Sequence, residues 1–69
     1  MILQIAEITI EGVKEVITYD SETRRIYEQS GCDITPASQA NGYQDIYEAI
    51  EDVKRLYADE EWELVLIKQ

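Results

Sequence analysis

The chain begins with a segment in which apolar and polar side chains alternate. Residues 2–10, ILQIAEITI, are rich in β-branched residues. Ala6 and Ile8 fall on one side of an extended chain, and Glu7 falls on the other. The pattern predicts a β-strand.

Two further short segments have the same character. Residues 13–19, VKEVITY, follow Glu11-Gly12, a pair that suits a tight hairpin turn of the primed type. The segment DSETR, residues 20–24, predicts a type I turn, because its aspartate and serine can bond their own backbone. RIYEQ, residues 25–29, then resumes β character. The three predicted strands form an antiparallel meander.

The period changes in residues 45–58, DIYEAIEDVKRLYA. Apolar side chains recur there at steps of three and four residues, which predicts one amphipathic helix. Asp45, followed three residues later by Glu48, has the form of a capping box. The helix is predicted to end near Ala58, because the acidic residues that follow would oppose the helix dipole.

A fourth strand is predicted in residues 62–68, WELVLIK. Its two sides are both apolar, which is typical of a strand buried on both faces. A right-handed crossover through the helix would place this strand beside the first strand and parallel to it. The expected fold is one α+β domain over residues 1–69 with the element order β-β-β-α-β. Its four-stranded sheet is mostly antiparallel, in the order 3-2-1-4, with the helix on one face.

The connection in residues 30–44 holds the only cysteine and the only proline of the chain. Thr35 before Pro36 predicts a short helical turn near residues 36–40, with the threonine as its cap and the proline in its first position. The Asn-Gly pair that follows tolerates the left-handed backbone angles at which such a turn ends. We expect a structured connector that packs across the sheet edge. The alternative is a loop that binds a partner.

A single helix covers only one face of a sheet. Alternation along the strands predicts that several apolar side chains point to the other face, which would then pack against a second copy of the chain or a partner. The predicted self-association residues are Leu3, Ile5, Val16, Val65 and Ile67.

Fifteen acidic and six basic residues give the 69-residue chain a net charge of -9. This charge disfavours direct contact with nucleic acid and favours attraction to a basic surface on a partner protein. The partner could be a nucleic-acid-binding protein, in which the carboxylates would take the place of phosphates. The predicted partner-binding residues are Glu7, Glu11, Glu15, Tyr43, Tyr47, Asp59, Glu60, Glu61 and Glu63.

The two tyrosines in this set flank the start of the predicted helix. An amphipathic ring at such an edge suits a protein interface. The alternative is that both rings cap the core and leave their hydroxyls in water.

Catalytic and metal chemistry are not expected. The chain has no histidine and one cysteine, so neither a disulfide nor a structural zinc site can form within it. Cys32 lacks the base or positive field that a nucleophilic thiolate needs, and its neighbour Asp33 is acidic. No glycine-rich phosphate loop is present. We therefore expect no enzyme activity, no catalytic or metal site and no cofactor.

The sequence also constrains location and assembly. No segment approaches the roughly 18 apolar residues of a membrane helix, and the N-terminus lacks the basic region of a signal peptide. A lone free thiol fits the reducing cytoplasm. Two functions remain: an acidic module that binds a basic partner, as an inhibitor or accessory factor, and a structural domain that forms a homodimer through its uncovered sheet face.

Overall fold

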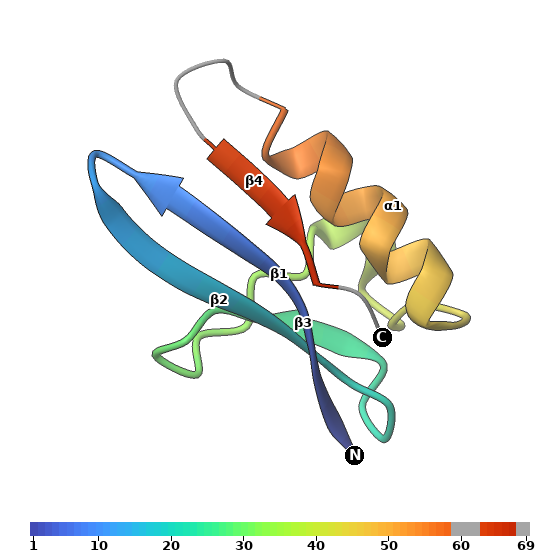
Figure 1. Cartoon of the computed structure of the whole chain (residues 1–69). Helices are drawn as coiled ribbons and strands as arrows, with labels where there is room; N and C mark the ends of the chain where they lie inside the picture. Colours follow the sequence, from blue (N-terminus) through green and yellow to red (C-terminus); the bar gives the residue numbers. More distant parts are fainter. Residues whose placement is uncertain (59–62, 68–69) are drawn as a thin grey trace.

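The computed structural model describes residues 1–58 and 63–67 of the chain (Figure 1). The strands form one sheet in the order β3-β2-β1-β4, and the helix packs on one of its faces. The predicted α+β fold and strand order are confirmed. The elements are β1 (Ile2–Ile10), β2 (Val13–Asp20), β3 (Arg25–Tyr27), the 3-10 helix η1 (Ala37–Gln39), α1 (Ile46–Leu56) and β4 (Glu63–Leu66).

The turns between the first three strands lie where their sequences predict them, but the second is wider than the predicted type I turn, because its backbone hydrogen bond joins Asp20 to Arg24, four residues on. Glu11 and Gly12 have φ angles of 51° and 81°, both positive as a primed hairpin turn requires. After β2, the Asp20 side chain accepts a hydrogen bond of 2.9 Å from the backbone N–H of Glu22. The Asp20 carbonyl oxygen accepts another, of 2.6 Å, from the Arg24 N–H. Both strand pairs of the meander are antiparallel.

β4 runs antiparallel to β1, so the predicted parallel pairing is wrong. The reason lies in the connection from β3 to α1. β3 ends at Tyr27, two residues earlier than predicted, because residues 32–35 turn back along it and Tyr27 forms a bridge with Asp33. The connection then returns to the β2–β3 turn, where the Tyr43 N–H donates a hydrogen bond of 2.6 Å to the Arg24 carbonyl oxygen. This extra pass reverses the direction in which α1 and β4 run (Figure 1).

The connection is structured and lies along the β3 edge of the sheet, as expected. Its helical turn begins one residue later than predicted, since Pro36 occupies the N-cap position of η1 and makes no side-chain capping bond. The Thr35 hydroxyl instead accepts a hydrogen bond of 2.9 Å from the Ile26 N–H. Gly42 has a φ of +90° and lies so close to the β2–β3 turn that an added Cβ would be 2.9 Å from the Arg24 carbonyl oxygen.

The helix α1 lies within its predicted range. The Asp45 side chain caps it by accepting a hydrogen bond of 2.9 Å from the Glu48 N–H, as the capping motif predicts. Ala49 and Val53 are fully buried against the sheet and bring the apolar stripe of the helix into the core.

A β-bulge in β1 determines which side chains enter the core. Gln4 pairs with Thr18 and Ala6 pairs with Ile17, so Ile5 is the extra residue. The bulge shifts the alternation by one position, and Ile5 and Ala6 therefore both point to the helix side. The buried core consists of Ile5, Ala6, Ile8, Ile17, Tyr19, Ile26, Tyr43, Ala49 and Val53.

The sheet face that α1 does not cover is mostly polar, and we refer to it as the open face. The prediction that Leu3 and Ile5 point to it is wrong, because Ile5 is 0% exposed within the core and Leu3 pairs with the core residue Tyr19. Val16 and Val65 do belong to the open face, and Ile67 is half-buried beyond the end of β4. By strand register the open face comprises Ile2, Gln4, Glu7, Thr9, Lys14, Val16, Thr18, Asp20, Arg25, Tyr27, Glu63 and Val65.

β4 is an edge strand, and among the described residues its only strand partner is β1. Val65 is 52% exposed and Leu66 is also exposed. The prediction that this strand is buried on both faces is therefore wrong for a single chain, because Val65 lies on the open face, which α1 does not cover.

Candidate functional site

The predicted acidic residues do not gather on one surface. Glu7 lies on the open face, and Glu63 lies on the same face because it pairs with Thr9, two positions further along β1. The acidic residues at 59–61, Asp59, Glu60 and Glu61, fall outside the described residues. Only Glu7 and Glu63 of the predicted set are thus placed together.

The other two predicted glutamates lie elsewhere. Glu11 is exposed in the β1–β2 turn. Glu15 pairs with Ile8, which places it on the helix side of the sheet. The Glu15 Oε2 atom is buried and receives no hydrogen bond from the described residues. Glu15 therefore does not extend the open face.

The two predicted tyrosines have opposite environments. Tyr43 is fully buried, so its predicted place at an accessible edge is wrong. Its hydroxyl donates a hydrogen bond of 2.5 Å to the Asp52 carboxylate, which also pairs with Arg55. Burial raises the pKa of Tyr43, against the nearby positive charge of Arg55. Tyr47 is 74% exposed, and its role in partner binding stays a prediction.

Ion pairs neutralise most of the basic side chains. All of the lysines and arginines except Lys68 lie among the described residues. Arg24 makes no ion pair with the described residues. The other four form the pairs Lys14–Glu7, Arg25–Asp33, Lys54–Glu51 and Arg55–Asp52.

The pair between Arg25 and Asp33 ties the connection to β3. Arg25 also donates a hydrogen bond of 2.6 Å to the Ala40 carbonyl oxygen, and the Thr35 N–H donates one of 2.9 Å to Asp33. Burial alone would raise the pKa of Asp33, but the hydrogen bonds from Arg25 and Thr35 hold this pKa below its ordinary value. The pair also keeps Arg25 from acting as a free cation on the open face.

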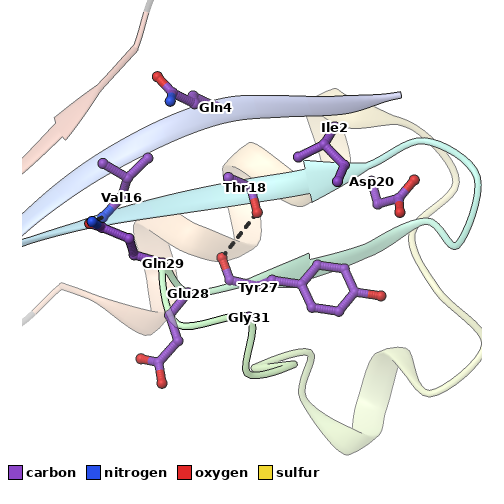
Figure 2. A pocket seen from close by; sticks show the side chains of 9 residues that line it. All are labelled: Ile2, Gln4, Val16, Thr18, Asp20, Tyr27, Glu28, Gln29 and Gly31. Atoms are coloured by element: carbon purple, nitrogen blue, oxygen red, sulfur yellow. Dashed lines mark hydrogen bonds between the residues drawn. The ribbon is translucent and has the colours of Figure 1, made fainter.

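A hollow of about 560 Å³ lies in the open face (Figure 2). Its volume is within the range of about 300–1,000 Å³ that is typical of ligand sites. Figure 2 shows side chains from β1, β2, β3 and the turn after β3 around it. The hollow is lined by Ile2, Gln4, Val16, Thr18, Asp20, Tyr27, Glu28, Gln29 and Gly31.

Hydrogen bonds hold the floor of the hollow in place. The Thr18 hydroxyl donates to the Tyr27 carbonyl oxygen at 3.4 Å, which links β2 to β3 (Figure 2). The Gln29 side-chain oxygen accepts a hydrogen bond of 3.4 Å from the Val16 N–H. This second contact holds the turn after β3 against β2 and forms one wall of the hollow.

The residues that line the hollow include two acidic ones, Asp20 and Glu28, and no lysine or arginine. The Asp20 carboxylate is 19% exposed and lies 3.8 Å from the N-terminal ammonium of Met1. The Glu28 carboxylate points away from the other labelled side chains (Figure 2). An alkyl chain that carries a positive charge suits such a surface, because it meets apolar side chains such as Val16 and acidic residues around them.

Other chemistry has little support in the described part of the chain. Cys32 is a free, exposed thiol. Residues 1–58 and 63–67 contain no cluster of three or more cysteines, aspartates or glutamates placed to hold a metal ion. Within the same residues, no helix has the length and apolar character that crossing a bilayer demands.

Sequence reasoning missed the hollow. Of its lining residues only Val16 was singled out from the pattern, and for self-association. Comparison with protein-family models, with curated proteins and with solved structures gave no match to this chain. The functional assignment therefore depends on the geometry and charge of the open face.

Proposed function

We propose that the protein is a small acidic interaction module that binds a basic surface of a partner protein through its open face. The observation that carries this proposal is the hollow, whose lining includes the acidic residues Asp20 and Glu28 beside the apolar side chains of Ile2 and Val16, and no lysine or arginine. The net charge of -9 supports it further, since long-range attraction speeds the encounter with a basic protein.

Such a module acts by occupying a surface and not by chemistry. Carboxylates that take the place of phosphates would let it cover the site of a nucleic-acid-binding protein, as an inhibitor or an accessory factor. The lone thiol of Cys32 favours a reducing compartment, and we propose the cytoplasm as the place of binding.

Calorimetric titration with a lysine-rich peptide and with a basic DNA-binding protein tests this function. We expect binding at low salt that is lost near 1 M salt, where the screening length falls to about 3 Å. Thr18→Lys places a cation in the hollow and is expected to abolish binding. Thr9→Lys is the matched control, because it makes the same change on the same face outside the hollow. Absence of binding to both probes at low salt would remove the proposal.

Self-association through the open face is the second candidate. It is supported by the exposure of Ile2 and Val65, which are 68% and 52% exposed. The polar character of the rest of this face and the repulsion between two chains of charge -9 oppose it. Sedimentation velocity separates the two cases: a dimer that Val65→Lys dissociates supports self-association, and a monomer at all micromolar concentrations excludes it.

A further inference from the structure

We infer that the outer edge of β4 binds an extended, basic segment of a partner protein, which joins the sheet there as an additional antiparallel strand. The inference goes beyond the proposed function, because the surface it names runs along the backbone of β4 and is separate from the hollow. Strand addition of this kind takes its affinity from main-chain hydrogen bonds and its specificity from the side chains that alternate along the edge.

The two edges of the sheet differ in how the chain itself covers them. At the β3 edge, the Ile34 N–H donates a hydrogen bond of 3.0 Å to the Ile26 carbonyl oxygen, and the Ile26 N–H donates one of 2.9 Å to the Thr35 hydroxyl. At the opposite edge, β4 has β1 as its only strand partner in the part of the chain that the structure describes (Figure 1). The β4 edge is therefore the one that is open to a further strand.

The backbone of β4 directs the N–H and C=O groups of Leu64 and Leu66 to this outer edge. The Ile67 N–H donates a hydrogen bond of 3.0 Å to the Ile5 carbonyl oxygen on β1. Hydrogen-bonded positions recur at every second residue of an antiparallel strand, so Val65 also bonds β1 and the residues on either side of it face away from β1. Leu64 and Leu66 thus offer the donors and acceptors with which a further strand pairs.

The exposed side chains of β4 indicate what the added strand carries. Val65, on the open face, is 52% exposed, and Leu66, on the helix side, is 39% exposed. Apolar side chains placed opposite them on a neighbouring strand remove this surface from water. Proteins commonly protect a free edge with lysine or proline, and the β4 sequence ELVL contains neither.

Glu63 determines the charge of the added strand. It is exposed, lies on the open face like Val65, and forms no ion pair with the described residues. Opposite charges that face each other across two strands stabilise the pairing. An antiparallel segment would thus carry apolar residues opposite Leu66, Val65 and Leu64, followed by a lysine or arginine opposite Glu63. A second copy of the chain would bring its own charge of -9 to this edge, so charge favours a basic partner.

Amide hydrogen exchange, followed by NMR, tests the inference with a synthetic peptide that holds Val-Val-Val-Lys between flanking threonines. In the free protein, the Leu64 and Leu66 amides should exchange faster than the Val65 amide. Saturating peptide should slow the exchange of both leucines about tenfold or more and leave Val65 nearly unchanged.

Two N-methylated forms of the labelled peptide are the matched controls, measured by fluorescence anisotropy. A methyl group on the valine opposite Leu64 removes an N–H that would donate to the edge, and we expect it to weaken binding at least about fivefold. A methyl group on the valine opposite Val65 replaces an N–H that points away from β4, so binding should be retained.

The charge pair has its own control. Glu63→Gln should weaken binding of the lysine peptide about two- to fivefold, as expected for an exposed ion pair. It should not change binding of the same peptide with glutamine in place of the lysine. Glu11→Gln removes the same charge from the exposed β1–β2 turn and should leave binding of both peptides unchanged.

The outcomes separate the inference from the proposed function. Absence of binding, equal effects of the two methyl groups, or unchanged exchange of Leu64 and Leu66 at saturation would each overturn strand addition. Signal shifts confined to the hollow would overturn it as well and retain the proposed function. Slower exchange of the two leucines as the concentration of the free protein rises would assign the edge to a second copy and overturn the choice of a basic partner. Protection of both leucines with unchanged signals at Val16 and Thr18 would support strand addition independently of the hollow.

Discussion

Replacement of Tyr43 by phenylalanine tests the buried hydrogen bond that anchors the helix to the connection. The ring of Tyr43 is fully buried, and its hydroxyl lies 2.5 Å from an oxygen of Asp52, which is 6% exposed. Tyr43→Phe keeps the ring and removes only the hydroxyl. The Asp52 carboxylate then retains Arg55 as its remaining side-chain partner among the described residues.

The expected cost follows from the burial of this carboxylate. A hydrogen bond to a charged group contributes about 1.5–3 kcal/mol, and water cannot reach Asp52 well enough to replace the lost donor. We therefore expect Tyr43→Phe to lower the free energy of unfolding by about 2 kcal/mol. For a domain of this size that corresponds to a decrease in Tm of about 8–16 °C.

Urea denaturation followed by far-UV circular dichroism measures this cost. Tyr47→Phe is the matched control, because the same hydroxyl is removed from a ring that is 74% exposed, and a change within about 0.5 kcal/mol is expected. A double-mutant cycle with Asp52→Asn should give a coupling energy of at least about 1 kcal/mol. Equal stability of Tyr43→Phe and Tyr47→Phe, or the absence of coupling, would refute the role of this hydrogen bond.

Three further substitutions test the connection and the helix start. Asp33→Asn should lower the free energy of unfolding at pH 7, because the folded state lowers the pKa of Asp33. The difference in unfolding free energy from the wild type should shrink as the pH falls below about 4, the pKa of an unfolded aspartate, and should vanish below the pKa of Asp33 in the folded state. Gly42→Ala should cost about 2 kcal/mol or more in unfolding free energy, because an added Cβ would meet the Arg24 carbonyl oxygen at 2.9 Å and φ is +90°. Asp45→Ala should cost about 1 kcal/mol through loss of the helix cap, measured by urea denaturation.

Each of these predictions has a result that contradicts it. A difference in unfolding free energy between Asp33→Asn and the wild type that stays constant from about pH 7 to about pH 2 would contradict the first prediction. Gly31→Ala is the control for Gly42→Ala, because φ is +91° at Gly31 but the space around an added Cβ is open; equal costs would disprove the close approach. Unchanged stability of Asp45→Ala would show that the cap is not needed.

Local patterns predicted most of the fold. The primed turn at Glu11 and Gly12, the cap at Asp45 and the helical stripe around Val53 each depend on residues close together in the chain. Alternation and the change of period gave the element order, and the rules of strand connection gave the strand order. Such features are encoded within a few residues, which is why a single sequence suffices for them.

The errors arose where distant residues decide the geometry. The bulge at Ile5 fits β1 to β2, and the adjacent apolar residues Ile5 and Ala6 do not show by themselves that both side chains point to the same face. The direction of β4 depends on the return of the chain along β3, which the pair between Arg25 and Asp33 stabilises. Neither feature is visible in the residues of one element.

The candidate site was missed for the same reason. Residues from β1, β2 and β3 meet in the hollow only because of the strand register, so Ile2, Thr18 and Tyr27 have no common pattern in the sequence. The position of Tyr43 just before the helix predicts an edge, and the spacing in the sequence does not identify its buried partner Asp52. The excess of acidic residues was visible in the composition, but their distribution over the surface was not.

The most direct test of the account is an NMR titration of the uniformly ¹⁵N-labelled protein with a lysine-rich peptide at low salt. Binding at the hollow predicts the largest shifts of backbone amide signals at Val16, Thr18 and Tyr27 and little change along α1. Shifts concentrated on α1, or no shift at low salt, would contradict binding of a basic segment at the open face.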